Sequence, residues 1–437
     1  MIGSLGADIF ENRRKQLAAL LNGTPLILVA PPPVRRNNDV FYPYRPDSSF
    51  RYLTGFLEPD AVAVVTAEGR FILFVRPRDP KIELWDGTRA GPEGALAHWG
   101  ADEAYPYSEI EVVLKPQLAK AERLAFHHNP DSHLSNRIHG MLETIARERS
   151  DHRGPSEIVR PGVFLDPLRF IKTEADLSLY RSASQVTRDA HVALFRHTHA
   201  GEFEYQLEAR LNQTFRNAGG DWAYPPIVAT GANACVLHYI NNDAQLIDGQ
   251  VVLVDAGAEM EGCAADVTRC FPVGTHFEGP ARDLYTLCLE AQLKCLDEAV
   301  AGCTLQGLHQ TAARVITAGL IDLSILDGDV DERVADDSFK PYFPHGLGHF
   351  LGMDVHDVGT RVRDDGTPRP LPAGTCITIE PGIYIQPGDS GADERFHGIG
   401  IRIEDNVVLQ QGGHENLSAE IPKAIDDIEA LRREATP

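Results

Sequence analysis

The sequence VVLVDAGAEMEGCAADVTRC, residues 251–270, predicts an antiparallel hairpin with strands at 249–258 and 264–272. Asp255 and Asp266 fall on opposite strands, so a hairpin of this length could place their carboxylates beside each other. Two aspartates near a hairpin could also serve turns and solvation alone. However, Asp255 ends a run of Val and Leu, where an unpaired carboxylate is costly. A bound metal cation would remove that cost.

A glycine-rich segment further along the chain carries three histidines. It reads HGLGH from His345 to His349, and His356 follows. Two histidines four residues apart also occur in the helical zinc motif H-E-x-x-H, but Gly346 and Gly348 oppose a helix and exclude that motif. A single histidine in such a segment is more often structural than a ligand. Three within twelve residues, beside glycines that permit close backbone approach, favour a functional site.

Two further acids end predicted strands near the C-terminus. Glu380 follows an apolar run in the strand-like segment 374–385, and Glu404 lies in the segment 398–409. Strand alternation puts Arg402 and Glu404 on one face. Together with the two aspartates and one histidine of HGLGH, these acids make a set of four carboxylates and one imidazole. Such an oxygen-rich set suits two divalent ions, and Mn²⁺ more naturally than a thiolate-bound zinc.

Five short motifs, in this order, carry a family resemblance: VDAG, ADVTR, HGLGH, IEPG and GIRIED. The chain resembles the pita-bread dinuclear metallopeptidases, peptidase family M24, and within them it looks like the aminopeptidase P family of Xaa-Pro aminopeptidases. The resemblance extends to VLHY at 236–239, NDVFYPYRPDSSFRYLTG at 38–55 and ELWDGTRAG at 83–91. It implies an α/β N-terminal domain over residues 1–165 and an α+β pita-bread (creatinase/aminopeptidase) catalytic domain over residues 166–437.

The resemblance also implies a role for each residue of the predicted site. Two divalent ions, Mn²⁺ first and Co²⁺ or Zn²⁺ as alternatives, would be held by Asp255, Asp266, His349, Glu380 and Glu404. Asp266 and Glu404 would bridge the two ions. The residues implied in catalysis are Glu380 as general base and three histidines that line the substrate pocket and stabilise the tetrahedral intermediate, His238, His345 and His356. Arg402 would orient an acidic neighbour. Two aromatic residues would contact substrate, namely Tyr384 and Trp85, the latter at the site of a neighbouring subunit.

The implied reaction removes the N-terminal residue from peptides with proline in second position, by attack of a hydroxide bound to both metals. Two close cations lower the pKa of a shared water, and a nearby carboxylate can pass its remaining proton to the departing amine. A prolidase, which cleaves only Xaa-Pro dipeptides, is the alternative, but the segments 38–55 and 83–91 favour the aminopeptidase. A metal-free creatinase-like hydrolase or binding protein is a further alternative, although all five ligands are present.

Other segments predict ordinary elements of secondary structure. In the first domain, Leu26–Ala30, Ala61–Val65 and Phe71–Val75 predict strands, and Asp131 is expected to cap a helix. In the second domain, apolar residues at helical spacing predict several long helices. The acidic segment 327–337, DGDVDERVADD, predicts a solvated loop.

Composition restricts the partners and the compartment. In the 437 residues, Asp and Glu outnumber Lys and Arg by 63 to 41, which gives a formal charge of −22. That charge would repel nucleic acids and anionic membranes, so neither is an expected partner. The seven cysteines include no C-x-x-C pair, and the first residues lack the apolar core of a signal peptide, so we expect a cytoplasmic protein. The family resemblance implies a homodimer or homotetramer.

Overall fold

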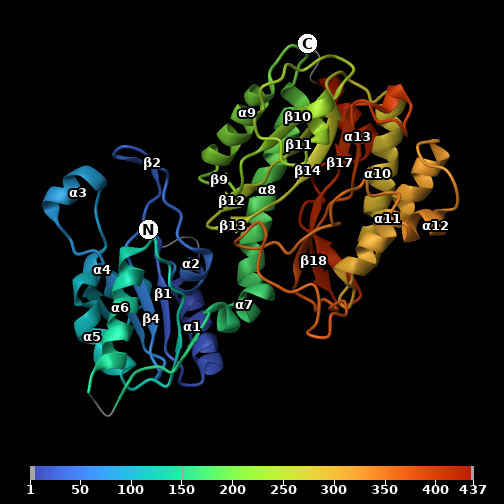
Figure 1. The fold of residues 1–437 in the computed structure, drawn as a ribbon. Coiled ribbons are helices and arrows are strands. Elements are labelled where there is room, and N and C mark those ends of the chain that lie inside the picture. The colour runs from blue at the N-terminus through green and yellow to red at the C-terminus, as the bar shows by residue number, and fades with distance from the viewer. Residues whose placement is uncertain (1–4, 150–151, 435–437) are drawn as a thin grey trace. The chain divides into compact units, whose positions relative to one another are not determined.

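The computed structural model describes residues 5–149 and 152–434 (Figure 1). The chain forms two compact units, and the division between them falls between Arg169 and Phe170. The sequence predicted a division between residues 165 and 166. Among the described residues, no helix is both long and apolar enough to span a membrane.

The first unit is built on a six-stranded mixed sheet in the order β6-β5-β4-β1-β7-β8. The central strands β1, β4 and β5 pair antiparallel, and the outer strands join them in parallel. The strands of this sheet are β1 (Leu26–Val29), β4 (Val62–Val65), β5 (Phe71–Val75), β6 (Glu103–Pro106), β7 (Arg123–Ala125) and β8 (Glu157–Val159). The three strands predicted from the sequence are thus the central ones. A separate hairpin pairs β2 (Arg35–Asn37) with β3 (Val40–Phe41).

Helices cover both faces of this sheet, because successive residues of a strand point to opposite sides. On β5, Leu73 and Val75 join one apolar cluster, whereas Ile72 and Phe74 join the other. The first cluster packs against α1 (Ala7–Leu21), α2 (Ser48–Thr54), α4 (Gly91–Trp99) and α7 (Gly162–Phe170), and the second against α5 (Ile110–Leu118) and α6 (His133–Arg147). The short helix α3 (Pro80–Asp86) buries no residue.

The predicted cap of helix α6 was wrong by one residue. The N-cap is Ser132, whose hydroxyl accepts a hydrogen bond from the backbone N–H of Ser135. Asp131 is exposed and its own N–H is bonded to Asn129. Either side chain can serve as a cap, so the choice depends on where the backbone enters the helix.

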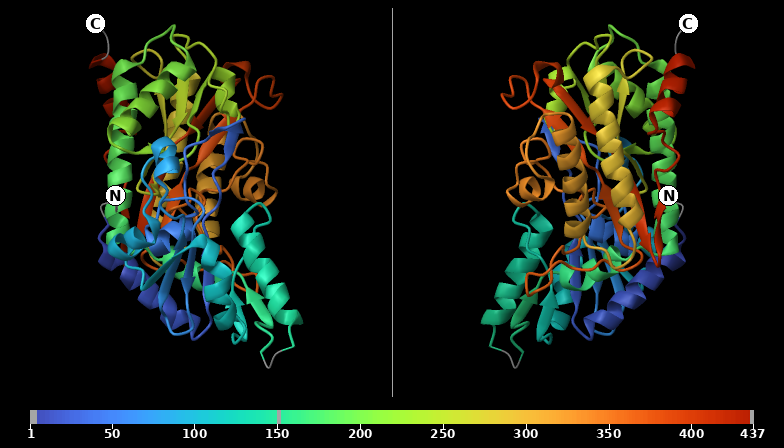
Figure 2. Two further views of the ribbon diagram at one scale, coloured as in Figure 1. Left: turned by 90° about the vertical axis from the view of Figure 1, so that its left-hand side faces the viewer. Right: turned by 90° about the vertical axis from the view of Figure 1, so that its right-hand side faces the viewer.

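The second unit combines small antiparallel sheets with long helices around one apolar core. Its strands are β9 (Asp221–Trp222), β10 (Ile227–Thr230), β11 (Val251–Asp255), β12 (Ala258–Met260), β13 (Cys263–Ala264), β14 (Thr268–Pro272), β15 (Cys376–Ile379), β16 (Gly382–Ile385), β17 (Ile399–Arg402), β18 (Asp405–Gln410) and β19 (Gly413–Asn416). Its helices are α8 (Glu174–His197), α9 (Glu204–Asn217), α10 (Gly279–Glu298), α11 (Leu305–Asp322), α12 (Val330–Ala335) and α13 (Ile425–Glu434). Helices α10 and α11 lie side by side (Figure 2).

The predicted hairpin at 249–272 is present but broken near both aspartates. Strands β11 and β14 pair antiparallel in a sheet with β10, and the tip of the hairpin, β12 and β13, belongs to a different sheet with β9. Asp255 ends β11, whereas Asp266 lies in the link between β13 and β14. At the break the two chains approach closely, since a Cβ on Gly257 would lie 1.7 Å from the carbonyl oxygen of Ala265. The glycine therefore permits the bend that turns both carboxylates to one side.

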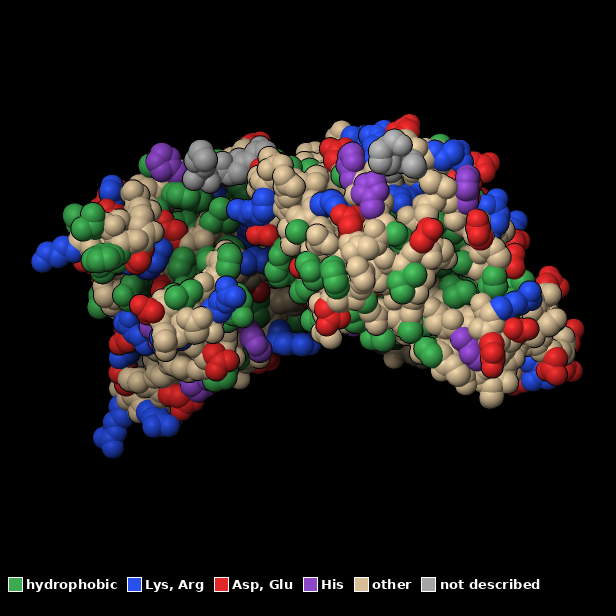
Figure 3. Space-filling view, turned by 90° about the horizontal axis from the view of Figure 1, so that it is seen from above, with side chains coloured by type: hydrophobic (Ala, Val, Ile, Leu, Met, Phe, Trp, Pro, Cys, Tyr) green, Lys and Arg blue, Asp and Glu red, His purple; other side chains and the backbone are tan. Residues whose placement is uncertain are grey.

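The acidic segment 327–337 is not a loop throughout, as the sequence had suggested. It contains α12, and the side chain of Asp329 caps that helix by accepting hydrogen bonds from the N–H groups of Asp331 and Glu332. Acidic residues in a first helical turn are favoured by the helix dipole, which explains why a charged segment folds here. None of the helix is buried. Elsewhere on the surface, acidic side chains are scattered among other residue types over the face that Figure 3 shows.

Candidate active site

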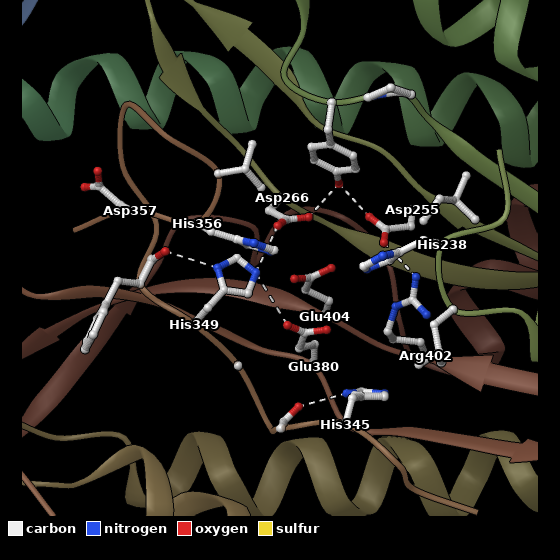
Figure 4. Close-up of a pocket in the computed structure, with 18 of the residues that line it drawn as sticks. His238, Asp255, Asp266, His345, His349, His356, Asp357, Glu380, Arg402 and Glu404 are labelled. Carbon is white, nitrogen blue, oxygen red and sulfur yellow. Dashed lines mark hydrogen bonds and ion pairs between the residues drawn. The ribbon is translucent and has the colours of Figure 1, made fainter. Parts of the chain in front are cut away.

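The second unit contains a cavity of about 710 Å³ that collects most of the predicted site. All five predicted metal ligands line it, as do four further predicted residues, His238, His345, His356 and Arg402 (Figure 4). Two predicted substrate residues do not line it. Tyr384 is buried behind the wall, and Trp85 belongs to helix α3 of the first unit, where its side chain is 85% exposed.

The predicted ligands come from the ends of strands and the loops beside them. Asp255 ends β11, Asp266 precedes β14, His349 lies before β15, Glu380 follows β15, and Glu404 joins β17 to β18. The HGLGH loop lies against β15, because the N–H of Thr378 donates to the carbonyl of His349 at 3.0 Å. A Cβ on Gly348 would lie 2.0 Å from the carbonyl oxygen of Thr378, so this close approach requires the second glycine of HGLGH.

His349 has the geometry of a metal-binding imidazole. Its Nδ1 lies 3.1 Å from the carbonyl oxygen of Phe350, to which a protonated Nδ1 donates. That bond leaves Nε2 as the ligand atom. Nε2 lies 3.3 Å from Oδ2 of Asp266 and 3.5 Å from Oε1 of Glu380. Ligand atoms of Asp266, His349 and Glu404 all lie within 4.8 Å of one another, as the donors around a single ion would.

The charges of the cluster also fit divalent cations. Three buried carboxylates and the half-buried Glu380 line the cavity together, and among the described residues Arg402 is the one guanidinium bonded to a carboxylate of this group. Burial and the neighbouring negative charges raise the pKa of Glu404 well above its ordinary value, and burial raises the pKa of Glu380 to about 7. Burial also raises the pKa of Asp255, although Arg402 opposes that shift. Such a surplus of buried negative charge is costly unless cations neutralise it.

Arg402 connects the carboxylates to the cavity wall. Its Nη2 donates to Oδ2 of Asp255 at 2.6 Å, its Nη1 to the hydroxyl of Tyr384 at 2.9 Å, and its Nε to Oγ1 of Thr268 at 3.1 Å. The hydroxyl of Thr268 in turn donates to Oε2 of Glu404 at 2.8 Å. Arg402 therefore contacts Asp255 directly and Glu404 through the hydroxyl of Thr268, so that it can orient both acids.

The three predicted pocket histidines differ in what their ring nitrogens contact. In His345, Nδ1 lies 2.8 Å from the carbonyl of Gly346 and Nε2 lies 2.9 Å from the hydroxyl of Tyr384, so both nitrogens are engaged by the protein. Burial lowers its pKa to about 4, which keeps the ring neutral. For His238 and His356, no hydrogen bond to a ring nitrogen is present within the described residues. Those two imidazoles are free to meet a substrate.

Tyr224 is a residue of the site that the sequence reasoning missed. Its hydroxyl lies 2.5 Å from Oδ1 of Asp255 and 2.5 Å from Oδ1 of Asp266, so it links the first two predicted ligands. Tyr224 lies in the loop between β9 and β10, where it is followed by two prolines. No spacing or motif connects it to the aspartates, so the sequence carries no signal for this contact.

Comparisons with known proteins identify the family of this chain. The model of metallopeptidase family M24 matches residues 178–411, and that of the aminopeptidase P N-terminal domain matches residues 10–126. A Xaa-Pro aminopeptidase of Haemophilus influenzae is 39% identical over 98% of both chains. Among solved structures, the aminopeptidase PepP of Pseudomonas aeruginosa is 41% identical with a TM-score of 0.95, covering 100% of this chain and 99% of its own. Proline aminopeptidase P II from Yersinia pestis is 37% identical with a TM-score of 0.94, and the match covers 98% of this chain and 100% of its own. The chain therefore belongs to metallopeptidase family M24 and, within it, to the Xaa-Pro aminopeptidases.

Proposed function

We propose that this enzyme removes the N-terminal residue from peptides whose second residue is proline, using two divalent metal ions held by Asp255, Asp266, His349, Glu380 and Glu404. The observation that carries the proposal is that one cavity contains these five side chains together with His238 and His356. Within the described residues, the ring nitrogens of these two histidines make no hydrogen bond. The relatives are named for the same activity, and that naming favours the aminopeptidase over the prolidase alternative.

The metal ions are the part of the proposal that rests on donor chemistry. Oxygen donors with one imidazole favour Mn²⁺, and Co²⁺ or Zn²⁺ are alternatives. For Escherichia coli aminopeptidase P, a Zn-substituted form has been solved in complex with product, which supports zinc as one of these alternatives. Bound ions would lower the pKa of a water molecule and polarise the scissile carbonyl. We assign Asp266 and Glu404 as the ligands shared by the two ions.

The chain's own residues would move the protons and hold the substrate. Glu380 would accept a proton from the attacking water and deliver it to the departing amine, and its pKa, raised by burial, supports this role. His238 and His356 would donate hydrogen bonds to the substrate and to the developing oxyanion. His345 would form part of the wall, because its nitrogens are already engaged, and Arg402 would hold Asp255 in place.

The experiment that tests this function compares three peptides: Xaa-Pro-Yaa-Zaa, Xaa-Ala-Yaa-Zaa and the dipeptide Xaa-Pro. Each is offered to chelated protein and to protein reloaded with Mn²⁺, Co²⁺ or Zn²⁺. We expect release of the first residue from Xaa-Pro-Yaa-Zaa by reloaded protein, with little cleavage of the alanine peptide and none by chelated protein. Cleavage of the dipeptide alone would identify a prolidase, and full activity after chelation would contradict the metal mechanism.

We also propose that the enzyme is a cytoplasmic homodimer or homotetramer. Leu84 and Trp85 on α3 are 81% and 85% exposed, which is unusual for large apolar side chains and supports contact with another copy of the chain. Within the described residues the cysteines form no disulfide bond, which supports a reducing compartment. Light scattering coupled to gel filtration would test the assembly, and a monomer at micromolar concentration would contradict it.

A further inference from the structure

A buried ion pair lies beside the part of the cavity wall that carries His356. Nζ of Lys172 lies 2.8 Å from Oδ2 of Asp357, and the two side chains are only 3% and 1% exposed. Both charges lose their hydration in such a pair, so it seldom stabilises a fold more than apolar side chains of the same volume would. A pair of this kind can, however, hold two segments of the chain at a fixed distance.

Lys172 projects from a segment that is itself anchored. It directly precedes Thr173, the N-cap of helix α8. Its backbone N–H donates to the carbonyl of Gly374 at 2.9 Å, and Ile171 pairs with Thr375 just before β15. The ammonium group therefore starts from a point fixed to the first turn of α8 and to the strand that leads to Glu380.

Asp357 is fixed at the other end of the pair. Its N–H donates to the carbonyl of Phe350 at 2.9 Å, which closes the loop between them. Its carboxylate packs on Gly352, where a Cβ would lie 1.7 Å from Oδ2. The carbonyl of Gly352 also accepts a hydrogen bond from the N–H of Ala264 in β13 at 3.1 Å. In Figure 4, Asp357 stands to one side of His356, away from the metal-ligand cluster.

His356 lies on this loop, directly before Asp357. Its ring meets the ring of His349 with centroids 4.3 Å apart, and within the described residues neither ring nitrogen is held by a hydrogen bond. The backbone beside it is held by Asp357. We propose that the Lys172–Asp357 ion pair positions His356 for peptide cleavage, which makes Lys172 a positioning residue for the reaction. This role rests on the proposed function.

A double-mutant cycle with His356 tests the proposal. The variants are Lys172→Met, Asp357→Asn and His356→Ala, and each of the first two combined with the third. For each, kcat and KM are measured on Xaa-Pro-Yaa-Zaa together with bound metal and the thermal midpoint. We expect Lys172→Met to lower kcat roughly ten- to hundredfold with the metal retained, since small displacements of a catalytic group have effects of this size. In the His356→Ala background the same change should lower kcat less than about twofold, because the positioned side chain is gone.

Two further variants separate positioning from folding. Asp357→Asn preserves the shape of the side chain, so it can be measured even if Lys172→Met folds poorly. It should likewise lower kcat when His356 is present and have little effect on kcat in the His356→Ala background. Arg432→Met removes another buried cation, one bonded to the carbonyls of Phe195, Thr198 and Val273 and absent from the cavity lining. It should lower the thermal midpoint and leave kcat unchanged.

The possible outcomes distinguish the two proposals. Equal losses of kcat with and without His356 would overturn the positioning role, as would an unchanged kcat in Asp357→Asn. If one of these results is found while the wild-type protein cleaves the peptide, the proposed function stands and only the role of Lys172 is lost. A wild-type protein that does not cleave it would overturn the function and this role together.

Discussion

Nε2 of His349 lies 3.3 Å from Oδ2 of Asp266, although the two side chains come from separate loops of the second unit. Burial alone would lower the pKa of His349, but the hydrogen bond to Asp266 and its charge raise that pKa to about 9. Without a metal, the imidazole therefore carries a proton at neutral pH, on the same nitrogen that would bind an ion. Nε2 of His349 can therefore hold a proton when the site is free of metal, and must lose that proton before it binds an ion.

Metal binding should consequently release protons. At pH 7 the metal-free site holds a proton on His349, whose pKa is about 9, and in part on Glu380, whose pKa burial raises to about 7; burial also raises the pKa of Glu404. A metal ion needs these groups deprotonated, so metal affinity should rise with pH up to about pH 9, and more steeply below about pH 7, where Glu380 is also protonated. Titration calorimetry with Mn²⁺ in buffers of different ionisation enthalpy should report release of about one proton or more per chain. Affinity independent of pH, with no proton released, would contradict this.

The acids gathered in the cavity could be predicted because their chemistry conflicts with their surroundings. Asp255 ends an apolar strand, and Glu380 and Glu404 each follow a strand, where a lone acid has no ordinary structural reason to lie. Five predicted ligands in five local motifs also identified the family, which the family models confirm. The pita-bread fold followed from the family and is confirmed by the solved relatives.

The contacts that join these residues could not be predicted. The break in the hairpin depends on the close approach of Gly257 to Ala265, which no strand pattern encodes. Whether His345 faces substrate or protein depends on the hydroxyl of Tyr384, which the fold brings to Nε2. Tyr224 reaches both aspartates from a loop that has no motif. In each case the determining neighbour is close in space and not marked in the sequence.

Replacement of Tyr224 by phenylalanine tests the hydroxyl that links Asp255 and Asp266. The ring would still line the cavity, but the hydroxyl that lies 2.5 Å from both carboxylates, and donates its one proton to either of them, would be lost. Residues that orient metal ligands typically contribute ten- to a hundredfold in metal affinity or activity, so we expect Mn²⁺ affinity to fall roughly tenfold. Calorimetric titration would measure this, with the circular dichroism spectrum unchanged. Wild-type affinity would show that the phenol does not orient the ligands.

Alanine at His356 and alanine at His349 should have different effects on metal content. The ring nitrogens of His356 are not hydrogen-bonded within the described residues, and we assign them to substrate, so His356→Ala should lower kcat by about a hundredfold or more with bound metal retained. His349→Ala removes a ligand and should lower both metal content and activity. Elemental analysis after gel filtration distinguishes the two variants. Loss of metal from His356→Ala would mean that His356 is itself a ligand.

Outside the site, His191 gives a prediction about stability and pH. The residue is fully buried in helix α8, and its Nε2 lies 3.1 Å from the carbonyl oxygen of Ala256, to which it donates. Burial lowers the pKa of His191 to about 4, although the hydrogen bond to Ala256 opposes that shift. The unfolded chain, with a pKa near 6.5, therefore binds a proton more readily than the folded chain between about pH 4 and pH 6.5.

The contribution of His191 to stability should be complete above pH 6.5 and be lost as the pH falls. From the two pKa values, about 2 kcal/mol is lost by pH 5 and about 3 kcal/mol by pH 4. His191→Gln keeps a donor for Ala256 but does not titrate. At pH 7.5 we expect the variant to be less stable, because the amide packs less well than the ring. The difference in thermal midpoint from the wild type, measured at equal metal loading, should shrink or reverse at pH 5. A difference that stays constant across this range would show that His191 does not carry the pH dependence.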